Sequence, residues 1–204
     1  MEIMTIGGGH MRIRIIVGIT GASGVILGVN LLKALAECPE CETHLVITES
    51  AKRTLEYETD LSFEDVISLA DYYHDINNLA ATISSGSFKT DGMVILPCSM
   101  KTLSGVVTGY TDNLLLRAAD VCLKERRRVI LAPRELPLNS IHLKNMSEAA
   151  QHGCVILPPM LTFYNNPSSI QDMINHLVGK IMMMFDLSFK GFVPWRGVKE
   201  NAQE

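Results

Sequence analysis

The chain has 204 residues, of which 47% are hydrophobic and 20% are charged, a composition typical of one globular domain with a full core. The apolar excess indicates that part of the surface is covered by other subunits. A net charge of −4 argues against nucleic acid and anionic membranes as partners.

The same composition predicts a cytoplasmic protein. No apolar run approaches the ~20 residues that span a bilayer, and the N-terminus lacks a signal-peptide pattern. The five cysteines are an odd number, which argues against a disulfide framework. We expect residues 1–11 to be an N-terminal extension, residues 12–195 a single α/β domain and residues 196–204 a C-terminal tail.

The first predicted strand, Ile13–Val17, leads into the glycine-rich turn Gly18–Gly24, which reads G-I-T-G-A-S-G. A strongly apolar helix is predicted to follow over Val25–Glu37. Amides at such a helix start point toward an anion, and glycines let the backbone approach it. The spacing G-x-x-G-x-x-G is not that of dinucleotide sites, so the pattern fits either a nucleotide or flavin phosphate or an ordinary tight turn.

Cys38 and Cys41 form a C-x-x-C pair, and His44 follows three residues later. A zinc site needs a fourth ligand and usually a second such pair, and none is evident in the sequence. The pattern therefore favours a surface turn between helix and strand over a zinc or redox site.

Strand and helix patterns alternate along the whole chain. The predicted strands are short and rich in Val and Ile, as buried parallel strands are; they are Ile13–Val17, His44–Thr48, Met93–Leu96, Val129–Ala132 and Val155–Leu157. The predicted helices are Val25–Glu37, Ser50–Tyr57, Phe63–Ala70, Leu103–Val107, Asp112–Arg127, Ile141–His152 and Ile170–Asp186. This order predicts a single-domain α/β fold, a doubly wound parallel sheet of Rossmann-like type.

Ligands of such sheets bind beyond the carboxyl ends of the strands. A polar or glycine-rich segment follows each predicted strand, so these segments are expected to converge on one edge. They are Gly21–Gly24, Thr48, Pro97–Thr102, Pro133–Glu135 and Pro158–Tyr164. The stretch Tyr72–Thr90 is the least regular part of the chain, which is typical of a binding loop.

Some of these side chains have a structural explanation beside a functional one. Ser99 and Thr102 fit the cap of a helix that begins near Leu103, and they equally fit a grip on a flavin's ring edge or ribityl chain. Arg134 and Glu135 follow a buried strand, where an unpaired charge is costly, and this favours a role in the site.

Arg117 and Lys124 share one helix face, which fits either a solvated surface or a phosphate clamp. The triplet Arg126–Arg128 is interpreted as a solvated helix end, Lys180 as an exposed lysine and His142 as a structural histidine. The chain has no Asp-Asp-x-x-Asp cluster, so a phosphorylated substrate would be held by Lys, Arg and Tyr rather than through magnesium.

Several motifs in fixed order make the chain similar to a known family. From about Arg12 to Trp195 it closely resembles the UbiX-type flavin prenyltransferases. The segment Ser84–Met93 is most similar to the branch of this family that is named for phenolic acid (hydroxybenzoate or vanillate) decarboxylases, of which its members are called subunits. The motifs are Thr20-Gly21-Ala22-Ser23-Gly24, Pro97-Cys98-Ser99-Met100-Lys101-Thr102, Arg117–Glu125, Pro133-Arg134-Glu135 and Phe163-Tyr164.

The resemblance implies a flavoprotein that binds reduced FMN through residues 12–195. It implies transfer of a dimethylallyl group from dimethylallyl monophosphate to N5 and C6 of that flavin, without a metal. The prenylated FMN would then serve a separate UbiD-type aromatic acid decarboxylase. A homododecamer with sites between subunits is also implied.

The site residues that the resemblance implies fall into three groups. Ser23 and Glu58 would lie near the reacting carbon, and Glu135 would exchange a proton with the departing phosphate. The FMN contacts would be Gly21, Ala22, Ser23, Thr48, Ser99, Met100, Lys101, Thr102 and Arg134. The dimethylallyl phosphate contacts would be Arg117, Lys124, Arg134, Glu135, Tyr164 and Lys180, with Tyr164 and Lys180 able to serve a neighbour's flavin.

Two of these positions differ from some relatives, and other functions remain as alternatives. Thr48 keeps the hydroxyl of the more usual serine, whereas Lys180 keeps the charge but not the fork of an arginine. A flavin-dependent peptidyl-cysteine decarboxylase would need a Pro-x-Met-Asn-x-x-Met motif, and a short-chain dehydrogenase a Tyr-x-x-x-Lys pair; the chain has neither. A flavin-carrying, non-catalytic decarboxylase subunit would show the same binding residues.

Overall fold

The computed structural model describes residues 12–195, so the predicted extension and tail lie outside the described residues. The chain divides into two compact units, the first ending at Pro158 and the second beginning at Pro159. The boundaries of one domain over 12–195 stay a prediction.

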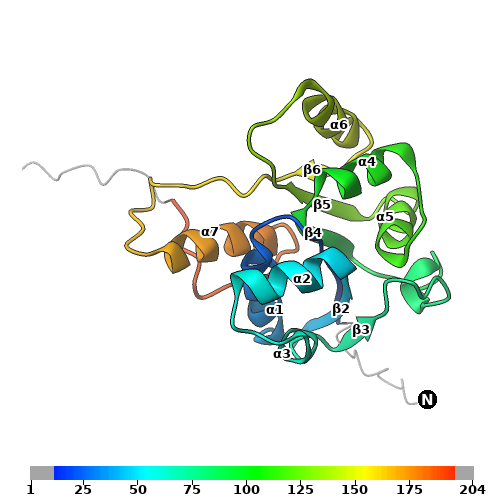
Figure 1. Ribbon diagram of the computed structural model, residues 1–204. Coiled ribbons are helices and arrows are strands. Elements are labelled where there is room, and N and C mark those ends of the chain that lie inside the picture. Colours follow the sequence, from blue (N-terminus) through cyan, green and yellow to red (C-terminus); the bar gives the residue numbers. More distant parts are fainter. Residues whose placement is uncertain (1–11, 196–204) are drawn as a thin grey trace, which may run out of the picture. The chain divides into compact units, whose positions relative to one another are not determined.

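Residues 12–158 of the first unit are built on one six-stranded parallel sheet of order β3-β2-β1-β4-β5-β6 (Figure 1). Strand β1 lies between β2 and β4, so the chain winds outward from β1 in both directions. This is the topological switch point of a doubly wound sheet, where ligands bind. The strands are β1 Ile13–Ile19, β2 Cys41–Ile47, β3 Tyr72–His74, β4 Gly92–Cys98, β5 Arg128–Pro133 and β6 Val155–Ile156.

Helices cover both faces of this sheet. Gly18 of β1 lies against Leu115, whereas the next residue, Ile19, lies against Gly28, because alternate residues of a strand point to opposite faces. Helix α1 therefore packs on one face and α5 on the other. The helices of this unit are α1 Val25–Ala36, α2 Glu49–Glu58, α3 Phe63–Ile67, α4 Met100–Thr108, α5 Leu114–Lys124 and α6 Ser140–Gln151, with a 3-10 turn η1 at Thr82–Ser84.

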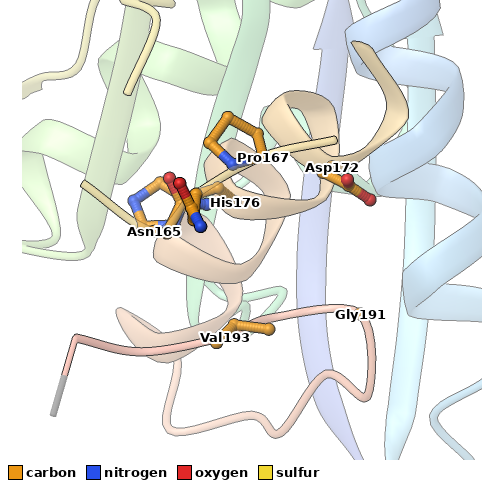
Figure 2. Close-up of a pocket in the computed structure, with 7 residues that line it drawn as sticks. Asn165, Pro167, Asp172, His176, Gly191 and Val193 are labelled. Atoms are coloured by element: carbon orange, nitrogen blue, oxygen red, sulfur yellow. The ribbon is translucent and has the colours of Figure 1, made fainter. Parts of the chain in front are cut away.

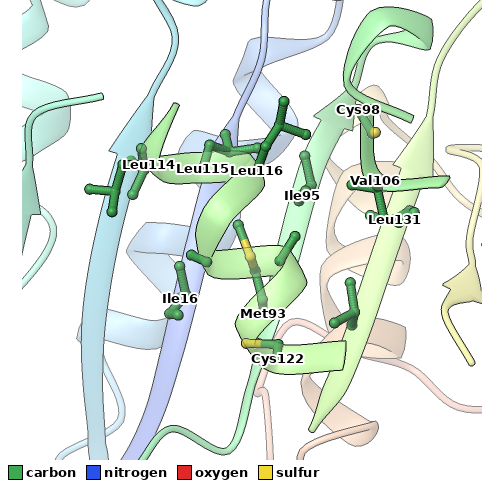
Figure 3. Packing of buried hydrophobic residues seen from close by; sticks show 14 of the residues in the cluster. Ile16, Met93, Ile95, Cys98, Val106, Leu114, Leu115, Leu116, Cys122 and Leu131 are labelled. Atoms are coloured by element: carbon green, nitrogen blue, oxygen red, sulfur yellow. The ribbon is translucent and has the colours of Figure 1, made fainter. Parts of the chain in front are cut away.

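The apolar core under α5 fixes the angle at which this helix meets the sheet (Figure 3). Leu114, Leu115 and Cys122 of α5 face Met93 and Ile95 of β4, and all five are almost fully buried. Burying a leucine or methionine side chain stabilises the fold by roughly 1.5–3 kcal/mol. The core therefore places the carboxyl ends of β1 and β4 on a rigid support.

The predicted doubly wound fold is confirmed, and each predicted strand and helix is present with shifted ends. Strand β3 is not predicted by the sequence pattern, because three residues at a sheet edge are too few to show a period. The prediction that the whole stretch Tyr72–Thr90 is irregular was therefore wrong at its start.

The second unit contains α7, Ile170–Met183. Ser169 caps this helix, and its side chain and that of Asp172 bond reciprocally to the backbone. Ile174, Val178 and Ile181 form its buried face. Among the described residues, no helix is long and apolar enough to cross a membrane.

Candidate functional site

The turn after β1 and the loop after β4 meet at the switch point, and Thr20 joins them. Its buried hydroxyl donates to the carbonyl of Pro97 at 2.7 Å and accepts the amide of Ser99 at 2.8 Å. The amide of Arg134, after β5, donates to the carbonyl of Cys98 at 3.0 Å. The three neighbouring strand ends are thus fixed to one another. Thr20 belongs to the recognised motif but was not among the predicted contacts.

Gly21 lies in a place that no side chain fits. A Cβ atom there would lie 2.5 Å from the Cβ and Oγ of Ser50 at the start of α2. Gly24 adopts a φ of 100°, in the left-handed region that glycine favours. Both glycines are therefore required by the turn itself, which confirms the strand–turn–helix arrangement predicted from the sequence.

The first amides of α1 are already occupied by a protein carboxylate. Glu58 Oε2 accepts the amide of Gly24 at 2.8 Å and that of Val25 at 3.1 Å. The sequence interpretation of this turn as an open phosphate cradle is therefore corrected for these two donors, because a phosphate would compete with Glu58. The amides of residues 21–23 donate no hydrogen bond within the described chain and are available to a ligand.

Ser23 and Glu58 come together at this turn, although 34 residues separate Glu58 from Gly24. Ser23 is exposed and directly precedes the glycine whose amide Glu58 accepts. The predicted pairing of Ser23 with Glu58 is thus compatible with the geometry.

Hydroxyl groups at the start of α2 extend the site. Thr48 caps α2 by accepting the amide of Ala51, and its hydroxyl lies 3.1 Å from that of Ser50. Thr54, one turn later, donates to the carbonyl of Ser50 at 2.9 Å and to that of Gly21 at 3.4 Å. Ser50 and Thr54 are not among the predicted site residues. The spacing Thr48-x-Ser50-x-x-x-Thr54, directly after a buried strand, is the signal that could have found them.

The loop after β4 shows the capping role that the sequence allowed. Ser99 accepts the amide of Thr102 at 3.2 Å, and the hydroxyls of the two residues are 3.0 Å apart. Thr102 is buried, whereas Lys101 is exposed and Met100 half-buried at the first turn of α4. The cap and a ligand contact are compatible, since Ser99 itself is half-buried.

Arg134 and Glu135 lie at the expected edge but are exposed in the isolated chain. The argument that they carry costly buried charges was therefore wrong. Among residues 12–195 the two side chains form no ion pair with each other, and the Glu135 carboxylate accepts the amide of Leu136 at 3.1 Å. Structure within one chain gives no other reason for this carboxylate.

Lys124 lies at the opposite edge of the sheet from Arg134. Helix α5 ends at Lys124, and β5 then runs from Arg128 to Pro133 before Arg134 begins. Six strand residues at about 3.3 Å each separate the two positions by roughly 20 Å. A phosphate held by Arg134 in one chain thus has no access to the same chain's Lys124, which pairs with Glu125.

Arg117 holds the chain rather than presenting a free charge. Its side chain donates to the carbonyl of Ser84 at 3.2 Å and pairs with Asp120 at 2.8 Å. Arg117 and Lys124 therefore do not form a phosphate clamp within one chain.

The interpretation of Arg127 as a solvated helix end was wrong. Its guanidinium donates to the carbonyls of Gly86 and Phe88 and to the hydroxyl of Thr90, at 2.6–3.2 Å. Five N–H donors in one planar group allow this arginine to order a loop that lacks strand or helix bonds of its own. The irregular segment 85–91 is thus held against the end of α5.

Tyr164 and Lys180 belong to the second unit, where Tyr164 lies against His176 (Figure 2). The Tyr164 hydroxyl is 2.9 Å from His176 Nε2, and their rings meet edge to face. Lys180 follows one turn later on α7 and is exposed. His176 was not predicted; a buried histidine four residues before Lys180 on the same helix face is the signal in the sequence.

The remaining candidates are structural. Cys38 and Cys41 lie in the turn that enters β2, and burial raises the pKa of both thiols, that of Cys41 to about 12, which opposes metal binding and redox chemistry. Within residues 12–195 no three His, Cys, Asp or Glu side chains are grouped to hold a metal ion. His142 completes the cap of α6, which confirms its structural role.

Comparison with known proteins gives the family. The model of the family described as Flavoprotein matches residues 8–184. A protein of Sedimentibacter hydroxybenzoicus, described as a probable UbiX-like flavin prenyltransferase, is 61% identical over 188 residues, covering 92% of this chain and 100% of the relative.

Two solved structures share the whole fold. A dodecameric FMN-dependent UbiX-like decarboxylase from Escherichia coli O157:H7 is 51% identical with a TM-score of 0.89, over 91% of this chain and 100% of that one. AnUbiX (PadA1), in complex with FMN and dimethylallyl pyrophosphate, is 49% identical with a TM-score of 0.90, over 92% and 100%. The chain thus belongs to the Flavoprotein family and, within it, to the UbiX-like flavin prenyltransferases.

Proposed function

We propose that this protein transfers a dimethylallyl group from dimethylallyl monophosphate to N5 and C6 of reduced FMN. The prenylated FMN is then passed to a UbiD-type aromatic acid decarboxylase. Family membership supports this reaction, as does the complex of a 49% identical relative with FMN and dimethylallyl pyrophosphate.

The observation that carries the proposal is the switch-point edge, whose residues fit a flavin. Gly21 has room for no side chain, the amides of residues 21–23 are available, and hydroxyls of Thr48, Ser50 and Ser99 surround the turn. Such backbone and hydroxyl donors suit an anionic phosphate and a polar ribityl chain. When bound, the reduced flavin supplies nucleophilic atoms and a flat face beside the allyl group.

The protein's own task is to stabilise the leaving phosphate. Arg134 offers a fixed positive charge at this edge, and Lys180 and Tyr164 offer an ammonium and a phenol. A phosphate beside Glu135 would favour the protonated form of that carboxyl, which suits it to proton exchange. Ser23 and Glu58 would lie beside the reacting carbon.

The placement of Lys124 adds an assembly requirement to the proposal. Because Lys124 lies about 20 Å from Arg134 in its own chain, it would reach a phosphate held by another subunit's Arg134. A dodecamer, the state given for the 51% identical relative, would supply such a neighbour.

The test is the identity of the flavin after reaction. The protein is incubated anaerobically with reduced FMN and dimethylallyl monophosphate, and the released flavin is analysed by mass spectrometry. A flavin heavier by one dimethylallyl group, which activates a flavin-free UbiD-type decarboxylase, is expected. Unmodified FMN bound at full occupancy would instead support the alternative of a non-catalytic flavin-carrying subunit.

The proposed compartment is the cytoplasm. All five cysteines of the chain are free thiols, and four of them are buried. A reducing compartment keeps such thiols intact.

A further inference from the structure

The second unit contains a pocket of about 200 Å³ beside Tyr164, and nothing described above uses it (Figure 2). His176 lines it from α7, and Asn165 lines it from the preceding loop. His176 is 5% exposed. Its Nε2 atom meets the Tyr164 hydroxyl at 2.9 Å, whereas Nδ1 and the Oδ1 of Asn165 have no hydrogen-bond partner within residues 12–195.

The ring of His176 carries one proton. Burial, and after it the charge of Lys180, lower the pKa of His176, so the imidazole is neutral at pH 7. The single N–H is therefore on Nε2, facing Tyr164, or on Nδ1, facing the pocket.

The pocket favours the proton on Nε2. A proton on Nδ1 would leave a buried N–H without an acceptor, which is rarer in proteins than an acceptor with a free lone pair. With Nδ1 bare, that atom and Asn165 Oδ1 are two acceptors in one pocket. A pocket of this size holds a water, which can donate one hydrogen to each.

The surroundings fix the ring. Phe192 packs on His176 with ring centroids 5.2 Å apart, and Trp195 meets Tyr164 edge to face at 5.7 Å. Gly179 leaves space for Phe192, since a Cβ atom there would collide with that ring. The imidazole thus has little freedom to leave the phenol.

We propose that His176 is a positioning residue that donates its Nε2–H to the oxygen of Tyr164 and so leaves the phenolic hydrogen free for the substrate phosphate. A phenol oxygen that accepts a hydrogen bond is a stronger donor, since bonds in a chain polarise one another. This inference rests on the proposed function, in which Tyr164 contacts the phosphate.

A double-mutant cycle tests the coupling. His176→Leu removes the donor at similar volume, His176→Gln retains an N–H on a flexible chain, and Tyr164→Phe removes the hydroxyl. His176→Leu should lower kcat for prenylation about 3- to 10-fold, the worth of one hydrogen bond, with KM for dimethylallyl monophosphate little changed. His176→Gln should recover part of the loss. His152→Leu, at an exposed histidine after α6, is the matched control and should leave kcat unchanged.

The double variant separates the possible roles. If His176 acts through Tyr164, His176→Leu has no further effect in a Tyr164→Phe background. Equal losses in both backgrounds would overturn the inference, because His176 would then act independently. Wild-type kinetics in Tyr164→Phe would instead show that the proposed role of Tyr164 is wrong, while prenylation by the wild-type protein still tests the proposed function itself.

The proton position can also be read in the wild-type protein, which does not depend on how a variant folds. Solid-state NMR of ¹⁵N-histidine-labelled protein distinguishes the two tautomers, and the His176 signals are those missing from the spectrum of His176→Gln. A protonated Nε2 is expected. A protonated Nδ1 in the neutral ring would overturn the inference.

Discussion

Glu135 is a carboxylate that one chain does not need. It is exposed, its Oε1 accepts a neighbouring amide, and it forms no ion pair with Arg134 among residues 12–195. Its exchange for Gln should leave stability within about 0.5 kcal/mol, as is usual for surface positions. The residue is therefore suited to a test that separates chemistry from folding.

Glu135→Gln should keep FMN binding and slow prenylation by about 10²–10⁴, the usual contribution of a general acid or base. Single-turnover spectra with reduced FMN measure this rate. The matched variant is Lys180→Ala, which removes a charge from α7 and should chiefly raise KM for dimethylallyl monophosphate. A Glu135→Gln enzyme that prenylates at the wild-type rate would show that the proposed proton exchange is wrong.

At the scale of elements, the start of α1 combines two demands. Its turn packs so closely on α2 that Gly21 has no room for a side chain, and its first amides bind Glu58. Packing and ligand approach therefore both exclude larger residues at Gly21, and a simple substitution would not tell them apart.

A compensated pair of substitutions distinguishes packing from ligand approach. Gly21→Ala should lower FMN occupancy, because the new Cβ would lie 2.5 Å from the Ser50 side chain. Adding Ser50→Gly removes that collision. If occupancy returns in the double variant, the requirement at Gly21 is packing; if occupancy stays low, the ligand itself approaches this glycine. FMN absorbance per subunit, with Ser50→Gly alone as control, measures both. Full occupancy in Gly21→Ala would contradict a flavin site at this turn.

The edge formed by β2 and β3 should make stability depend on pH. His44 Nδ1 lies 2.9 Å from His74 Nε2, and His44 Nε2 lies 3.0 Å from Glu42. Burial lowers the pKa of both histidines. They are therefore neutral in the folded protein at a pH where the unfolded chain, with an ordinary pKa of about 6.5, binds protons.

By linkage, stability should be complete above about pH 6.5 and fall as the pH drops from there toward the lower folded-state values. Urea unfolding at a series of pH values measures the slope. His74→Gln should make the slope shallower, because one depressed group is gone. An unchanged slope in that variant would show that this histidine pair does not carry the dependence.

Local patterns predict most of this fold and part of the site. The turn Gly18–Gly24 and the caps at Thr48 and Ser99 follow from short-range chemistry, and the sequence predicts them correctly. The contacts of Arg127 with the 86–90 loop do not, since they join residues about 40 positions apart whose meeting depends on tertiary packing. The same holds for Glu58 at the start of α1.

On the scale of the whole molecule, apolar side chains remain uncovered around α6. Leu136, Ile141 and Leu143 are 85%, 65% and 54% exposed. Clusters of this kind mark interaction surfaces. They agree with the proposal that Lys124 and Arg134 serve one site from different subunits.

Light scattering should accordingly find an assembly near twelve chains, as given for the 51% identical relative. Ile141→Glu places a charge on the exposed apolar surface and should shift the protein toward smaller species, because burying an unpaired charge in an interface is costly. Gln151→Glu, an exposed polar position at the end of the same helix, is the matched control and should assemble as the wild type does. Prenylation should fall with assembly in Ile141→Glu, since separated chains lose the neighbour's Lys124. A monomeric wild-type protein with full activity would contradict the shared site, and a fully assembled Ile141→Glu variant would show that α6 is not part of the interface.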